Sequence, residues 1–79
     1  MVDKLYLKPW EEAKVDTSSN TVAVLVMSGN VVITNTDYSI VFAELTEKEM
    51  FTLPIQTGLY VLKSQDVPSE VYLFRMFIY

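Results

Sequence analysis

Short apolar runs separated by turn-forming residues dominate this chain. Residues 22–27 are apolar at every position, and a second apolar run, residues 31–33, follows directly after Gly29-Asn30. Glycine supplies the positive φ that a two-residue hairpin turn needs, and asparagine tolerates such a φ better than most residues. The pattern predicts an antiparallel hairpin made of the strands Thr21–Ser28 and 31–35.

Further strand-like segments lie on both sides of this hairpin. Residues 4–8 alternate around Leu5 and Leu7 and stop at Pro9, which predicts a short edge strand. Other strands are predicted at 38–45, 50–53, 59–64 and 71–78, with turns at 36–37, 46–48, 56–58 and 65–69. In total, about seven strands with short connections predict an all-β fold, a small antiparallel barrel or sandwich.

The polar segment 11–20 interrupts this pattern. It contains several turn-forming residues and lacks a helical apolar face, so we interpret it as a connecting loop with room for one helical turn at 10–14. We therefore treat residues 1–79 as a single domain, in which 1–20 form an edge strand and loop and 21–79 form the barrel.

Two of the predicted strands are apolar on both faces. An antiparallel sheet with one wet face alternates apolar and polar residues, yet residues 22–27 and 72–79 are apolar almost throughout, apart from Arg75. Hydrophobic residues make up 51% of the chain, which is high for a domain of 79 residues. We therefore expect an outer apolar face that is covered by a partner, and a homodimer built on the exposed sheet.

Charge and hydropathy limit the location and the kinds of partner. The longest apolar run is far shorter than the ~18 residues of a membrane helix, and the charged N-terminal segment does not resemble a signal peptide. We expect a cytoplasmic protein that does not enter the membrane. Because the net charge is −4 and the six Lys and Arg residues are dispersed, we expect no direct nucleic-acid binding.

The side chains that carry most enzyme chemistry are missing from the sequence. With no histidine and no cysteine, the chain has neither the usual zinc, copper or iron ligands nor a Ser-His or Cys-His pair. Carboxylate pairs remain at 11–12 and at Glu47 and Glu49, but solvated turn charges account for them, and an acid–base role would need burial. We expect no enzyme activity, no metal site and no cofactor.

Aromatic residues are the best candidates for a binding site. They occur on four successive predicted strands: Tyr38, Phe42, Phe51, Tyr60, Tyr72, Phe74 and Phe77. Two interpretations stay open: the rings line an apolar cavity for a small ligand, or they fill the core. Arg75 is the one charge in the last strand, so it either pairs with a carboxylate or recognises an anionic ligand.

Several segments also resemble a known family. They are Val24-Leu25-Val26-Met27-Ser28-Gly29-Asn30-Val31, Leu45-Thr46-Glu47-Lys48-Glu49-Met50-Phe51-Thr52-Leu53-Pro54, the strand through Tyr60, and Val71-Tyr72-Leu73-Phe74-Arg75. Over residues 20–78 the sequence resembles the N-terminal cupin-like domain of AraC-type transcriptional regulators, particularly those of Bacteroides-like bacteria. That family carries lysine-glycine-glutamate-methionine-phenylalanine-x-leucine-proline, and Lys48 stands here where glycine is usual.

The resemblance implies a cupin-like (jelly-roll) barrel that senses a small-molecule effector and forms homodimers. It does not extend to the helix-turn-helix half of these regulators, so these 79 residues are expected to contain no DNA-binding domain. Strand parity assigns five aromatic side chains to the barrel interior, and Arg75 is the polar candidate, so the expected ligand-binding residues are Tyr38, Phe42, Phe51, Tyr60, Tyr72 and Arg75. The alternative is a stand-alone β-barrel that binds another protein and has a filled core.

Overall fold

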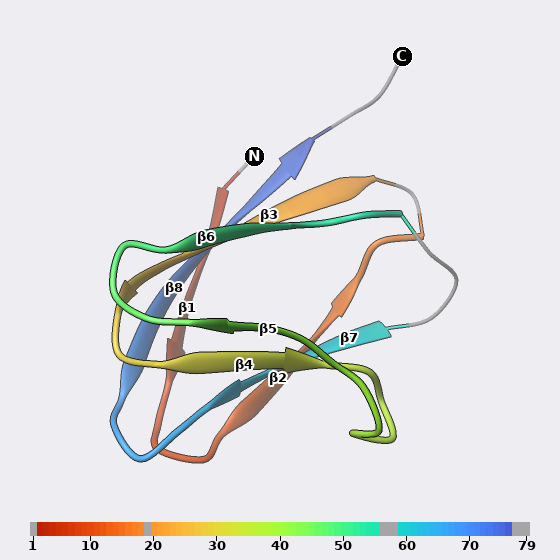
Figure 1. Cartoon of the computed structure of the whole chain (residues 1–79). Coiled ribbons are helices and arrows are strands. Elements are labelled where there is room, and N and C mark those ends of the chain that lie inside the picture. Colours follow the sequence, from red (N-terminus) through yellow and green to blue (C-terminus); the bar gives the residue numbers. More distant parts are fainter. Residues whose placement is uncertain (1, 19, 56–58, 77–79) are drawn as a thin grey trace.

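The fold is a pair of four-stranded antiparallel sheets that face each other (Figure 1). The computed structural model describes residues 2–18, 20–55 and 59–76, and within them every regular element is a strand. The strands are β1 (Val2–Leu7), β2 (Glu12–Asp16), β3 (Thr21–Ser28), β4 (Val31–Thr34), β5 (Val41–Leu45), β6 (Met50–Leu53), β7 (Leu59–Ser64) and β8 (Ser69–Met76). Sheet A has the order β1-β8-β3-β6, and sheet B has the order β2-β7-β4-β5.

The all-β prediction is confirmed, with eight strands rather than seven. The additional strand is β2, which lies inside the segment 11–20 that was interpreted as a loop with a possible helical turn. Its side chains alternate along an edge strand, with Val15 buried while Glu12 and Lys14 are exposed. Only two apolar side chains are needed on such a short strand with one wet face, so its apolar signal is weak.

The predicted hairpin around Gly29 is wrong, although both of its strands exist. β3 pairs with β6 and β8, whereas β4 pairs with β5 and β7, so Gly29-Asn30 carries the chain from sheet A to sheet B. A two-residue connection has the same sequence signal whether it joins strands within one sheet or between two sheets. The pairing partners are set by the distant strands, which a local pattern does not contain.

The predicted boundaries differ from the structure in three other places. The strand expected from residue 38 begins at Val41, because 35–40 form a loop closed by hydrogen bonds from the Asn35 N–H to the Ile40 carbonyl (3.2 Å) and from the Tyr38 N–H to the Asn35 carbonyl (3.1 Å). β1 occupies Val2–Leu7 instead of 4–8, and β8 begins earlier than expected, at Ser69. The predicted turn at 56–58, and residues 77–79 with Phe77, lie outside the described residues.

The core lies between the two sheets and consists mainly of aliphatic side chains. Alternate residues of the strands point inward, which is the period of two that a half-buried strand requires. Twelve buried residues form one cluster: Val15, Val22, Val24, Val26, Val31, Ile33, Leu45, Leu53, Tyr60, Leu62, Val71 and Leu73. Leu5, Phe42, Ala43 and Phe51 pack against this cluster from its margins.

The connections at Gly29-Asn30 and at 65–68 meet at one end of the barrel, where a small polar network joins them. The Ser69 hydroxyl donates to the Asn30 carbonyl (3.1 Å) and accepts from the Asn30 N–H (3.2 Å). The Ser64 hydroxyl lies 2.9 Å from that of Ser69 and donates to the Val67 carbonyl (2.7 Å). Because Ser64 and Ser69 are buried, these bonds compensate for the loss of water. The network fixes the Gly29-Asn30 connection against the start of β8.

The tight turn between β5 and β6 is stabilised by the Glu49 carboxylate. This carboxylate accepts hydrogen bonds from the Thr46 N–H (2.7 Å) and the Thr46 hydroxyl (2.7 Å). The two donors hold the pKa of Glu49 below its usual value. Lys48, in the same turn, has a φ of 66°. Glycine adopts such a left-handed conformation without the strain that a side chain brings.

Replacing Glu49 with glutamine should therefore destabilise the protein in a pH-dependent way. Because folding lowers the pKa of Glu49, its carboxylate stabilises the fold fully above the ordinary carboxyl pKa, and this contribution disappears as the pH falls through the folded-state value. The urea midpoint of Glu49→Gln should lie below that of the wild type at about pH 7 and approach it at about pH 3. Glu47→Gln removes one charge from the same turn and serves as the control. A midpoint difference that does not change with pH would contradict this assignment.

Candidate functional site

Two of the predicted ligand-binding residues meet inside the barrel. The rings of Phe42 and Tyr60 pack edge to face, with centroids 5.1 Å apart and an interplanar angle of 72°. Tyr60 is only 2% exposed, and its hydroxyl donates to the Pro54 carbonyl (3.3 Å), which also accepts from the Thr17 hydroxyl (3.0 Å). Burial raises the pKa of Tyr60, so it stays neutral. These rings take part in the packing of the barrel end.

Phe51 also points inward, from β6 in the opposite sheet. It lies on β6 opposite Val24 and packs against the buried cluster while remaining half exposed. Three of the six predicted residues, Phe42, Phe51 and Tyr60, are thus core or core-margin residues. Binding of a ligand by them stays a prediction.

Tyr38 and Tyr72 do not point into the barrel, so the expected convergence of all the rings is wrong. Tyr38 is 52% exposed, and its hydroxyl lies 2.8 Å from both carboxylate oxygens of Glu12 on sheet B. Tyr72 lies between the inward residues Val71 and Leu73 on β8, which places its ring on the outside of sheet A. Tyr38 lies in the 35–40 loop, before β5 begins at Val41, so the predicted strand parity does not apply to Tyr38.

Arg75 has a carboxylate partner within the chain. Its Nε lies 3.4 Å from Asp3 Oδ2 across the β8–β1 pair, and its Nη1 donates to the Asp16 carbonyl (3.3 Å). The side chains of both charged partners are partly exposed to solvent. The structure agrees with the ion-pair interpretation of this residue, and recognition of an anionic ligand stays a prediction.

The outside of sheet A is the most distinctive surface of the molecule. The strand register aligns its outward side chains in rows that cross the sheet. One row is Lys4, Tyr72, Leu25 and Met50, and the next is Val2, Phe74, Ala23 and Thr52. Tyr6, Glu70 and Ser28 form a third row at the end of the sheet. We call these three rows the sheet-A face.

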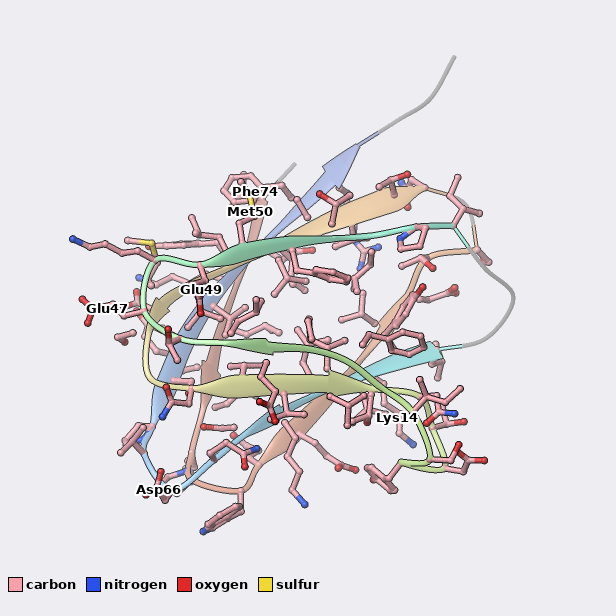
Figure 2. All side chains as sticks on the ribbon, in the orientation of Figure 1. Lys14, Glu47, Glu49, Met50, Asp66 and Phe74 are labelled. Carbon is pink, nitrogen blue, oxygen red and sulfur yellow. The ribbon has the colours of Figure 1, made fainter. Side chains whose placement is uncertain are left out.

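Large apolar side chains on this face are open to solvent. Val2 is 54% exposed, Met50 60% and Tyr6 67%, while Leu25, Tyr72 and Phe74 are half-buried. Figure 2 shows Phe74 and Met50 on the side of sheet A that points away from sheet B. The sequence signal for this face was that the runs 22–27 and 72–79 are apolar at nearly every position, whereas the contributions of Val2 and Met50 were missed.

The charged residues of the sheet-A face pair with each other. Lys4 Nζ lies 2.8 Å from Glu70 Oε1, and it also lies 4.8 Å and 5.5 Å from the ring centroids of Tyr6 and Tyr72. The hydrogen bond with Glu70 raises the pKa of Lys4, and the same bond lowers the pKa of Glu70. Both groups therefore stay charged at neutral pH, and their charges compensate each other locally.

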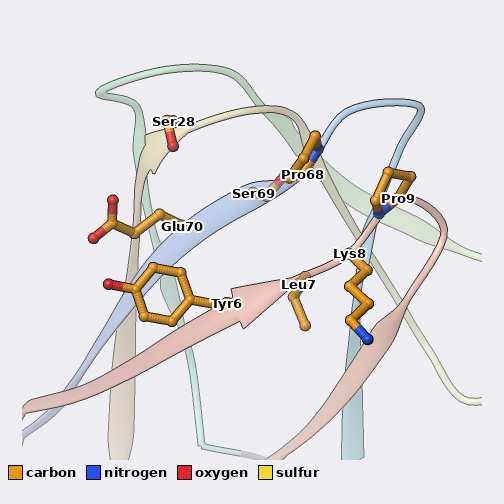
Figure 3. A pocket seen from close by; sticks show the side chains of 8 residues that line it. All are labelled: Tyr6, Leu7, Lys8, Pro9, Ser28, Pro68, Ser69 and Glu70. Atoms are coloured by element: carbon orange, nitrogen blue, oxygen red, sulfur yellow. The ribbon is translucent and has the colours of Figure 1, made fainter.

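A groove continues this surface beyond the row of Tyr6 (Figure 3). Its volume is about 310 Å³, and its walls are mostly apolar. It is lined by Tyr6, Leu7, Lys8, Pro9, Ser28, Pro68, Ser69 and Glu70. Three of these, Tyr6, Ser28 and Glu70, belong to the sheet-A face, whereas none of the six predicted ligand-binding residues lines the groove.

The outside of sheet B is different, because a loop of the same chain reaches over it. The Tyr38 hydroxyl contacts Glu12, and Lys63 Nζ lies 6.0 Å from the centroid of the Tyr38 ring. Glu12 and Lys63 are neighbours in the β2–β7 register. Val61 points outward with its neighbour Lys14, yet it is fully buried and lies outside the core cluster. Sheet B is therefore covered locally, and Tyr38 is part of that cover.

The described residues show no group of three or more acidic side chains placed to hold a metal ion. Over the same ranges, no helix is long and apolar enough to cross a membrane.

Comparison with solved structures supports the cupin-like fold. The Schizosaccharomyces pombe Cnp3 cupin domain is similar over 98% of this chain and 52% of its own, with a TM-score of 0.77 and 13% identity. Drosophila melanogaster CENP-C, solved bound to CAL1, is similar over 96% of this chain and 64% of its own, with a TM-score of 0.73 and 17% identity. A de novo designed double-stranded β-helix is similar over 96% of this chain and 99% of its own, with a TM-score of 0.74 and 17% identity.

These likenesses concern the fold alone, because the identities are low. The chain spans about half of the Cnp3 chain and less than two thirds of the CENP-C chain. No protein-family model matches the sequence, and no characterised protein matches it by sequence. The cupin-like part of the predicted resemblance is confirmed, whereas the origin in AraC-type regulators stays a prediction.

Proposed function

We propose that this chain, a domain of cupin-like fold, is a non-catalytic self-association module that binds a second copy through the sheet-A face. The observation that carries the proposal is the apolar outer surface of sheet A, with Val2, Tyr6 and Met50 more than half exposed. Exposed apolar surface of this kind marks protein contacts in soluble domains. The interior is packed with aliphatic side chains, which favours an association role over a catalytic one.

The charges of the face favour a second copy over a strongly charged partner. Lys4 and Glu70 compensate each other within the chain, so the face offers no net charge to attract an acidic or basic surface. An apolar and locally neutral surface can pack against an identical one without leaving a charge unpaired. The similar structure of CENP-C was solved with a bound protein, which is consistent with a role of this fold in protein association.

The proposal predicts that Tyr72→Lys separates the copies. Lysine places a second ammonium group beside Lys4, whose Nζ lies 5.5 Å from the Tyr72 ring centroid, at the middle of the contact, so self-association should weaken by about 100-fold or more. Sedimentation equilibrium up to about 500 µM chain would measure this. Because each copy carries a net charge of −4, added salt should strengthen the wild-type dimer by screening repulsion.

A matched control is Val32→Lys, which introduces the same charge on an outward, half-buried position of sheet B. This variant should retain the wild-type association. Circular dichroism melts of both variants would establish that they fold. A wild-type chain that stays monomeric at the highest concentration would refute the proposal, as would equal dissociation by both variants.

The second candidate is the effector-sensing domain of an AraC-type regulator. The Phe42–Tyr60 pair at the barrel end, within a cupin-like fold, favours it, since such rings are a usual lining of small-ligand sites. Thermal shifts across a panel of metabolites would test it: stabilisation of the wild type that is lost in Phe42→Ala supports a sensor. If no metabolite raises the melting temperature, the sensor interpretation fails and association remains.

A further inference from the structure

The sheet-A face has large and small side chains on different strands. β8 contributes the rings of Tyr72 and Phe74, whereas β3 contributes Leu25 and Ala23 in the same two rows. Ala23 is only 6% exposed, so its larger neighbours stand around it. The centre of the face therefore has a high side, along β8, and a low side, along β3.

Resting on the proposed self-association, we infer that the two copies are related by a two-fold axis that runs parallel to the strands, between β8 and β3. Such a rotation keeps the rows and exchanges the two central strands. Phe74 of each copy then packs over Ala23 of the other, and Tyr72 packs over Leu25. Large residues meet small ones twice, which gives the close packing that stable interfaces share with protein interiors.

The flanking strands fit the same arrangement. The rotation places β6 of the second copy over β1, so the exposed Met50 of that copy lies over the methylene chain of Lys4. Lysine covers apolar groups with its stem while its ammonium group stays with Glu70. At the end of the face, Glu70 lies opposite Ser28 of the second copy, a hydroxyl rather than a carboxylate.

A two-fold axis perpendicular to the strands does not fit. It would place β8 over β8, so that Tyr72 met Phe74, and β3 over β3, so that Leu25 met Ala23. Two layers of rings would hold the sheets apart on one side, while the smaller side chains left a gap on the other. Gaps of that kind lose both dispersion and apolar burial.

Exchanging the large and small residues tests this arrangement. Ala23→Phe places ring against ring, and Phe74→Ala leaves a gap, so each variant alone should associate at least about tenfold more weakly than the wild type. In an equal mixture, the heterodimer contains one native Phe74–Ala23 contact and one reversed contact. We expect the mixture to associate within about threefold of the wild-type affinity. Sedimentation of each variant and of the mixture gives the comparison.

A second measurement does not depend on these buried substitutions. The sequence contains no cysteine, so Val2→Cys and Thr52→Cys chains each carry a single thiol at an exposed position. The inferred axis places residue 2 of one copy opposite residue 52 of the other, so a bismaleimide that spans about 10 Å should link the mixed chains efficiently. The perpendicular axis separates these positions.

The outcomes distinguish the two proposals. If the wild type dimerises but the mixture is not rescued and the mixed thiols do not cross-link, the inferred axis is wrong and self-association stands. If the wild type stays monomeric, the proposed function itself fails.

Discussion

Gly29→Ala should lower the free energy of unfolding by about 2–5 kcal/mol, which is a large part of the stability of a domain this small. Gly29 has a φ of 89°, a conformation that side chains disfavour. A Cβ atom there would lie 2.5 Å from the Pro68 carbonyl oxygen and 2.8 Å from Ser69 Cα. Both are backbone atoms, one directly before β8 and one in its first residue, so neither can move away alone.

The substitution should also disturb the network that closes this end of the barrel, because Ser69 bonds to the residue after Gly29. Urea unfolding followed by circular dichroism would measure the loss. Asn30→Ala is the control in the same connection: the network uses the backbone of Asn30, so its replacement should cost about 0.5 kcal/mol or less. Equal losses in both variants would contradict the steric explanation.

Tyr60→Ala should cost about 3–5 kcal/mol of stability, because it removes the largest fully buried side chain of the described residues. The change leaves a cavity where the Tyr60 ring packs and leaves the Phe42 ring without its edge-to-face partner. It also removes the hydroxyl that donates to the Pro54 carbonyl.

Tyr60→Phe separates packing from hydrogen bonding at this position. It keeps the ring and loses only the bond to Pro54, so about 0.5–1.5 kcal/mol should be lost. Denaturant unfolding of the two variants gives the comparison. A loss in Tyr60→Phe as large as that in Tyr60→Ala would mean that the barrel end depends on the hydroxyl rather than on the ring.

Strand positions were largely predictable from the sequence, and strand pairing was not. The runs at 22–27 and 59–64 are apolar enough to be recognised locally, whereas β2 has too few apolar residues on its short inner side. The connection at Gly29 was recognised as a turn, but its two strands enter different sheets because each has better partners far away in the sequence. Such pairing depends on long-range packing, which periodicity does not report.

The candidate site depended on strand parity and therefore inherited its errors. Parity correctly places Phe42 and Phe51 against the core, because β5 and β6 are regular strands there. Parity fails for Tyr38, because this residue has a φ of 62° and lies in a loop rather than in a strand. It also fails for Tyr72, because the residues on either side of Tyr72 in β8 are the ones that point inward. The apolar residues in excess of those that a one-sided core needs were more informative, since they predicted an apolar outer face, which the structure places on sheet A.

The outer faces of the two sheets have a consequence for how large an assembly can grow. A sandwich with an apolar outer surface on both sheets can associate into open-ended stacks, because each added copy presents another apolar surface. On the outside of sheet B, Tyr38 is held by the Glu12 carboxylate and lies under Lys63 Nζ, while the neighbouring Ile40 and Val41 are more than half exposed. If two copies associate through their sheet-A faces as proposed, the two-fold interface is closed, and both sheet-B faces with their 35–40 loops lie on the outside of the pair.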